Sequence, residues 1–176
     1  MTKESPVWVV YDEYRLARLN VKYYSARLAS LERQNTVFDI ASAVTVPSSA
    51  VSGIFLLKIP IVATLWPYFV GIVVLFSIIK PFLRFGQKIK LYDQTLSGYR
   101  ALDHDLHEIV LKIRTEASYS ALSKKMFDAA MKKKRILVTN PPEQVSDNKL
   151  VEKFTLEVNS EIPTTSLFVP SQEDQK

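Results

Sequence analysis

The distribution of charged residues sets one long apolar segment apart from the rest of the chain. Between Asp39 and Lys80 the only charged residue is Lys58, which divides the segment into uncharged runs at 40–57 and 59–79. A helix needs about 20 apolar residues to cross a bilayer core, because each residue adds about 1.5 Å. The two runs therefore predict a transmembrane hairpin with Lys58 at its turn. The alternative is a buried core helix followed by a single span.

Basic residues flank this hairpin at the two ends that share one side of the membrane. Lysine and arginine are enriched in cytoplasmic loops, so the pattern places both termini in the cytoplasm. The residues concerned are Lys22, Arg27 and Arg33 before the hairpin, and Lys80, Arg84, Lys88 and Lys90 after it.

Amphipathic patterns on either side of the hairpin predict long helices. Residues 6–35 place apolar side chains at alternating spacings of three and four, from Val7 to Leu31, and residues 87–135 carry a similar stripe from Tyr92 to Ile113. The second helix has possible breaks at Gly98 and at 118–120. Since both helices leave the same membrane face, we expect them to pack together as a cytoplasmic bundle. The predicted fold is an all-α membrane protein.

Four segments follow from these patterns. They are an N-terminal amphipathic helix (1–36), the hairpin (37–85), a long helical region (86–139) and an acidic, partly disordered tail (140–176). Pro141 and Pro142 end the helical region, because proline cannot continue a helix. Within the tail, residues 147–159 fit a helix better than a strand, although the alternation after Phe154 also suits a strand.

Composition narrows the chemistry that the chain can perform. With 23 basic and 18 acidic residues the net charge is +5, and the absence of cysteine excludes thiolate catalysis and cysteine-based zinc sites. No phosphate-binding loop or hydrolase signature is present. His104 and His107 lie among carboxylates, but such a group on an amphipathic helix is typical of a solvated face. We expect no enzyme activity, no metal and no cofactor.

Hydroxyl side chains gather on one face of the first predicted span. The candidate pore-lining residues are Ser42, Thr45, Ser48, Ser49 and Ser52, with Asp39 at the inner end as a ring of carboxylates that favours cations. Pro47 is a candidate gating point, because it removes one helical hydrogen bond. The alternatives are close helix packing through small residues, a helix-terminal role for Asp39 and a static kink at Pro47.

Two groups of cations are candidate sites for an anionic ligand. They are Arg15, Arg18 and Lys22 in the N-terminal helix, and Lys124, Lys125, Lys132, Lys133, Lys134 and Arg135 in the long helical region. Such clusters bind anionic lipid, nucleic acid or nucleotides, or are simply solvated. The sequence alone does not place the two groups in one crevice.

The arrangement resembles the SLATT domains, two-transmembrane effectors of bacterial nucleotide-signalling and antiphage defence systems. The resemblance rests on Tyr11–Asn20 and its continuation Lys22–Arg27, on the hairpin, and on Tyr92, Tyr99, Leu102 and Glu108 in the following helix. It covers residues 6–135. It implies a bacterial inner-membrane effector that forms pores or perturbs the membrane. The release is by a nucleotide or oligonucleotide signal from a companion nucleotidyltransferase-type enzyme, by a partner, or by infection itself.

The predicted function is therefore a regulated ion-conducting pore, assembled as a homo-oligomer, with a tetramer expected. Two helices cannot enclose a channel alone, so the pore requires several copies. The alternatives are a non-conducting membrane scaffold that anchors a partner through its cytoplasmic helices, and a subunit of a membrane transporter.

Overall fold

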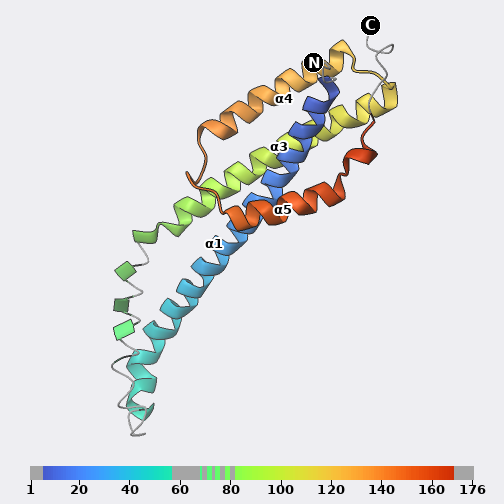
Figure 1. The fold of residues 1–176 in the computed structure, drawn as a ribbon. Coiled ribbons are helices and arrows are strands. Elements are labelled where there is room, and N and C mark those ends of the chain that lie inside the picture. The colour runs from blue at the N-terminus through green and yellow to red at the C-terminus, as the bar shows by residue number, and fades with distance from the viewer. Residues whose placement is uncertain are drawn as a thin grey trace. The chain divides into compact units, whose positions relative to one another are not determined.

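The computed structural model describes residues 6–56 and 82–168, together with 68, 71–72, 74–75 and 78–79 between them. For residues 41–56 the description is limited to the backbone. Every regular element in these ranges is helical, which confirms the all-α prediction (Figure 1). The elements are α1 (Pro6–Leu56), α3 (Phe85–Glu116), α4 (Ala121–Thr139), α5 (Asn148–Glu161) and a single 3₁₀ turn, η1 (Thr164–Ser166).

Within the described part of the chain, no helix has both the length and the apolarity needed to cross a membrane. The second predicted span, 59–79, lies outside the described residues except at isolated positions. The first predicted span, 40–57, is helical as far as Leu56, in the same uninterrupted helix that begins at Pro6.

Contacts divide the chain into two compact units. One unit combines Met1–Arg27 with Leu91–Lys176, and the other is Leu28–Lys90. In the second unit the rings of Phe38 and Phe85 lie 5.3 Å apart. The first unit contains most of the described side chains, and its interior is built by α1 and α3.

Helices α1 and α3 pack together in the first unit in antiparallel directions, because their contacts run in opposite order along the two sequences. Tyr24 of α1 stacks on Tyr99 at 5.3 Å between ring centroids, and Tyr14 lies against His107 at 5.6 Å. The apolar stripes predicted from the sequence form the core. Its fully or nearly buried members are Val7, Val10, Tyr14, Ala17, Tyr92, Leu96, Tyr99, Leu102, Leu106, Ile109 and Ile113.

The break between α3 and α4 falls at the serine-containing segment and not at Gly98. Ala117 ends the last turn of α3 in the left-handed region, with φ of 51°. Ser120 then caps α4, its hydroxyl accepting a hydrogen bond from the backbone N–H of Ser123. Gly98 stays inside α3, where the side chain of Leu137 in α4 occupies the space that a β-carbon would need. The glycine therefore serves helix packing.

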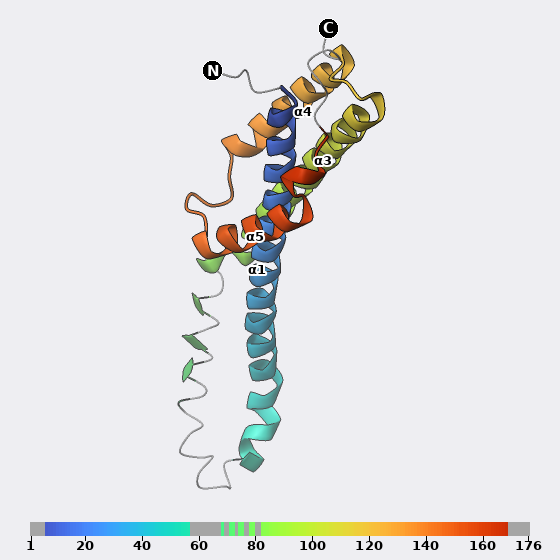
Figure 2. The same cartoon turned by 45° about the vertical axis from the view of Figure 1, so that its right-hand side comes forward.

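The tail contains a helix, α5, which resolves the helix-or-strand ambiguity at 147–159 in favour of the helix. Asp147 caps it by accepting hydrogen bonds from the backbone N–H groups of Lys149 and Leu150. Both views place α5 across α1 (Figures 1 and 2).

The chain after α5 returns to the beginning of the first unit. The hydroxyl of Tyr11 in α1 donates to the carbonyl of Phe168, and Arg114 at the end of α3 donates to the carbonyl of Ser166. Residues 164–166 of the tail predicted to be partly disordered form the turn η1, and Leu167 after it is extended.

Candidate functional site

The three cations predicted on the N-terminal helix form one stripe in the structure, called here the basic stripe: Arg15, Arg18 and Lys22. Their spacings of three and four place them on one side of α1. The half-buried Lys22 lies under α5, where its Nζ is 2.6 Å from Glu157 and 2.7 Å from Glu161. The hydrogen bonds that its ammonium group donates to these two carboxylates raise the pKa of Lys22.

The two arginines of the basic stripe have weaker partners. Arg15 donates from Nη2 to the amide oxygen of Asn159 on α5, at 2.7 Å, so no carboxylate balances its charge there. Arg18 donates to the hydroxyl of Tyr14 at 3.1 Å, and its Nε lies 3.2 Å from Asp103 of α3. These two atoms attract by charge, but their orientation does not make a hydrogen bond. Burial raises the pKa of Asp103, and the Arg18 charge opposes that rise.

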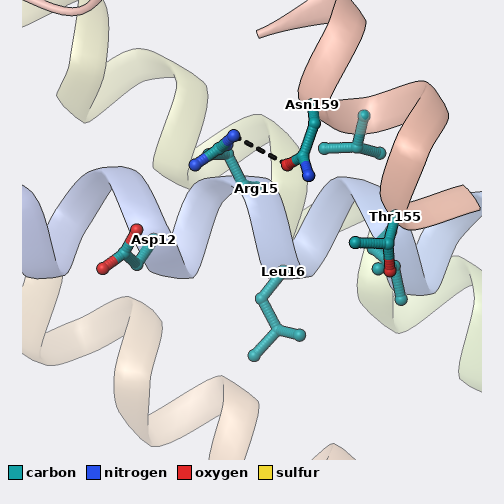
Figure 3. A pocket seen from close by; sticks show the side chains of 7 residues that line it. Asp12, Arg15, Leu16, Thr155 and Asn159 are labelled. Atoms are coloured by element: carbon teal, nitrogen blue, oxygen red, sulfur yellow. Dashed lines mark hydrogen bonds between the residues drawn. The ribbon is translucent and has the colours of Figure 1, made fainter. Parts of the chain in front are cut away.

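A cavity of about 190 Å³ lies between α1 and α5 beside Arg15 (Figure 3). Its walls mix apolar and polar groups from both helices: Asp12, Arg15, Leu16, Leu19, Thr155, Val158 and Asn159. The close-up shows Arg15 reaching Asn159, while Asp12 projects from α1 on the side away from Asn159. Arg15 of the basic stripe and α5 therefore border an open space of mixed polar and apolar lining.

The loop between α4 and α5 contains Glu143, whose carboxylate lies in the first unit. Glu143, nearly buried with 13% of its side chain exposed, accepts hydrogen bonds from the hydroxyls of Tyr23 and Tyr92 and from Arg27. The Arg27 and Tyr92 contacts are both 2.7 Å. The Tyr23 hydroxyl also accepts the backbone N–H of Asp147 at 3.0 Å. This group, called here the Glu143 cluster, fixes the start of the tail to α1 and α3.

Burial and hydrogen bonding act against each other in the Glu143 cluster. Burial acts to raise the pKa of Glu143, but the hydrogen bonds from Tyr23, Tyr92 and Arg27 outweigh it and leave that pKa below its ordinary value. Burial, followed by the hydrogen bond to Glu143, raises the pKa of Tyr92 to about 12. At neutral pH the cluster is therefore an ionised carboxylate held by neutral tyrosines and a cation.

The second predicted cation group, on α4, divides into paired and unpaired members. Lys133 lies 2.6 Å from Asp105 of α3, and Lys134 pairs with Glu13 of α1. Among the described residues, the other four have no ion-pair partner: Lys124, Lys125, Lys132 and Arg135. They are exposed, and an open depression of about 370 Å³ is lined by Asp128, Met131, Lys132 and Arg135. The two predicted groups do not converge on one crevice by any contact of their charged atoms.

The predicted pore residues are placed only in part. Asp39 is exposed on α1 and accepts a hydrogen bond from Asn35 at 2.9 Å. Pro47 lies within α1, as do the hydroxyl residues Ser42, Thr45, Ser48, Ser49 and Ser52, whose side chains lie outside the description. The pore face therefore stays a prediction.

The two histidines of the predicted cluster lie in different environments. His107 points inward, with its Nδ1 3.0 Å from the Tyr14 hydroxyl, while His104 is exposed and lies 3.8 Å from Glu108. Within the described ranges no group of three acidic or histidine side chains is placed to hold a metal ion.

The residues that meet the basic stripe were not predicted individually from the sequence. They are Asp103, Glu157, Asn159 and Glu161, together with Glu143 near Arg27. For those in the tail one signal existed: the chain from residue 136 onward contains 3 basic and 7 acidic residues, whereas residues 1–135 contain 20 and 11. Opposite net charges on two segments favour their contact.

In comparisons with known proteins, no family model, no curated protein and no solved structure matches the chain.

Proposed function

We propose that the chain is the subunit of a homo-oligomeric, pore-forming membrane effector, with residues 40–57 and 59–79 as its two spans. The uncharged lengths of these runs support the proposal, since each approximates the thickness of a bilayer core. The resemblance to SLATT domains supports a bacterial inner-membrane location and a role in antiphage defence, and we expect the oligomer to be a tetramer. In this proposal the first span lines the pore, the second faces lipid and both termini are cytoplasmic.

The observation that carries the proposal is the continuity of α1. One helix runs from Pro6 to Leu56 and contains both the basic stripe and the predicted hydroxyl face. A helix transmits displacement along its axis, because each turn is bonded to the next. In this proposal binding at the basic stripe acts on the predicted pore, with Pro47 as the candidate gating point.

The experiment is ion flux from liposomes that contain the purified protein, with its oligomeric mass measured alongside. The double change Thr45→Leu and Ser49→Leu is expected to reduce flux at least tenfold, because it replaces the hydroxyl face with apolar groups that dewet a pore. The matched control is Thr64→Leu with Ser77→Leu, which makes the same change in the second span. This control is expected to conduct like the unmodified chain.

Other results would contradict the proposal in distinguishable ways. A discrete oligomer without flux, also when the chain ends at Asn140, favours the non-conducting scaffold. A monomer without flux excludes a pore of any stoichiometry. Equal loss of flux in both double variants would contradict the assignment of the first span as the pore lining.

A further inference from the structure

Helix α5 meets the basic stripe of α1 through polar contacts. Val158 is the one buried residue of α5, and the large apolar side chain of Leu156 is 67% exposed. The contacts to the basic stripe are the two carboxylates at Lys22 and the amide at Arg15. Ion pairs that solvent reaches are weak and are screened by salt, so such an attachment is readily reversible.

The two carboxylates on α5 imitate a particular kind of ligand. Glu157 and Glu161 are four residues apart, which makes them neighbours on one face of the helix, and both approach the same ammonium group. A diphosphate group likewise presents two adjacent anionic centres. Lysine and arginine both bind phosphate oxygens through charge-assisted hydrogen bonds.

The charge of Arg15 is not balanced by α5. Its partner is the neutral amide of Asn159, and its buried Nε has no hydrogen-bond partner. The cavity beside it has room for further ligand atoms. Asp12 borders that cavity and would repel phosphate, and Lys22 is not part of its lining. A diphosphate bound at Lys22 would therefore lie beside the cavity, with the rest of the ligand toward Leu16 and Leu19.

We propose that the basic stripe is the binding site for a ligand with a diphosphate group, and that α5 occupies this site when the ligand is absent. The ligand displaces Glu157 and Glu161 from Lys22, and α5 moves away while the Glu143 cluster keeps its first residues near α1. This binding would regulate the proposed pore, so its biological meaning rests on the proposed function. Its test measures binding without ion flux, so the two can fail separately.

The test uses the full chain in neutral detergent, with pyrophosphate as the probe at constant ionic strength. Calorimetry gives the affinity, and hydrogen exchange of residues 148–161 reports whether α5 is released. We expect binding together with faster exchange in α5. Sodium chloride at the same ionic strength is expected to release α5 less than pyrophosphate does, because chloride screens the ion pairs but does not take the place of both carboxylates. Equal release by chloride would overturn the proposal, because screening alone would then explain it.

Charge-matched variants separate competition from a purely structural role of α5. Glu157→Gln removes one competitor and is expected to bind pyrophosphate about three- to fivefold more tightly, because the open site is more populated. Glu152→Gln removes the same charge from an exposed position of α5 that has no ion-pair partner among the described residues. It is expected to bind like the unmodified chain. Equal affinities of the two variants for pyrophosphate would overturn the proposed competition between α5 and the ligand.

Variants of the cations locate the site. Lys22→Gln is expected to weaken pyrophosphate binding about tenfold, and Lys22→Arg to restore most of it. The double change Lys132→Gln and Arg135→Gln is expected to have no effect. Binding that depends on Lys132 and Arg135 but not on Lys22 would overturn the proposal. So would release of α5 by phosphatidylglycerol in the micelle without any response to pyrophosphate, since the ligand would then be a lipid headgroup.

Discussion

Glu143 connects three segments that are far apart in the sequence. Its carboxylate receives hydrogen bonds from Tyr23 and Arg27 on α1 and from Tyr92 on α3, while the residue itself belongs to the loop before α5. A nearly buried carboxylate is costly unless its acceptor sites are filled, and here three donors fill them. Glu143 therefore contributes more to stability than the exposed carboxylates of α5 do.

Replacing Glu143 by glutamine is expected to lower the free energy of unfolding by roughly 1–3 kcal/mol at neutral pH, because it leaves Arg27 without its counter-charge. The folded-state pKa of Glu143 lies below its ordinary value of 4.5. The stabilisation is thus present above that value and is lost as the pH falls through the folded-state pKa. Chemical denaturation of both proteins at several pH values measures the difference.

Glu152→Gln is the control for this prediction, because it removes a carboxylate that is exposed on α5. Its unfolding free energy is expected to stay within about 0.5 kcal/mol of the unmodified chain. A difference between the unmodified chain and Glu143→Gln that stayed constant from about pH 7 to about pH 3 would contradict the role of the ionised carboxylate.

The sequence did not allow prediction of the individual polar partners of the basic stripe. The periodic spacing that identified Arg15, Arg18 and Lys22 is a local property, because residues three and four apart share a helix face. Their partners Asp103, Glu157 and Asn159 lie on other helices, and only the packing of those helices selects them from many exposed polar residues. The same reason explains why the paired Lys133 and Lys134 could not be told from the unpaired Lys132 and Arg135.

At the scale of elements, local patterns located the helices well. The stripes of α1 and α3 are buried as expected, since amphipathic spacing directly reflects burial. The break at 117–120 and the helix in the tail also carry local signals, a serine cap and an aspartate cap. The role of Gly98 was not predictable, because it depends on Leu137 of another helix.

The aspartate cap predicts how strongly α5 resists local opening. Asp147→Ala removes an acceptor for two backbone N–H groups and is expected to cost about 1 kcal/mol in the stability of α5. Amide exchange in residues 148–161 should become about fivefold faster. Hydrogen exchange with mass spectrometry gives the rate for each segment.

The cap of α4 is the control for this measurement. Ser120→Ala removes the hydroxyl that accepts from Ser123 N–H and should speed exchange in α4 while leaving α5 unchanged. If both variants accelerated exchange equally in both helices, the helices would open together, and α5 would not be an independently released element.

At the scale of the molecule, the first unit is assembled from the two ends of the sequence. Met1–Arg27 and Leu91–Lys176 together contain the α1–α3 core, the Glu143 cluster and the docking of Phe168 on Tyr11. Because α1 and α3 run antiparallel and Tyr24 contacts Tyr92, the chain ends at 27 and 91 lie at the same end of the helix pair. A short connection can therefore replace residues 28–90.

A chain in which a short Gly/Ser linker joins Arg27 to Leu91 is expected to fold by itself. It should be helical by circular dichroism and unfold in one cooperative thermal transition, because the buried stripes of both helices are retained. The comparison chain ends at Asn140 and lacks the Glu143 cluster and α5. Its midpoint is expected to fall by at least about 4 °C. Equal midpoints would contradict the contribution of the tail.

The contact of Lys22 with Glu157 and Glu161 also fixes an order of events on the ribosome. Lys22 is translated well over 100 residues before Glu157 and Glu161, and at about 5–20 residues per second this delay is on the order of 10 s. For that interval the nascent chain has Arg15 and Lys22 without the α5 side chains that later contact them. Newly made and mature copies in one cell therefore differ in whether this surface is open, and the youngest copies are the first to meet any anion that binds it.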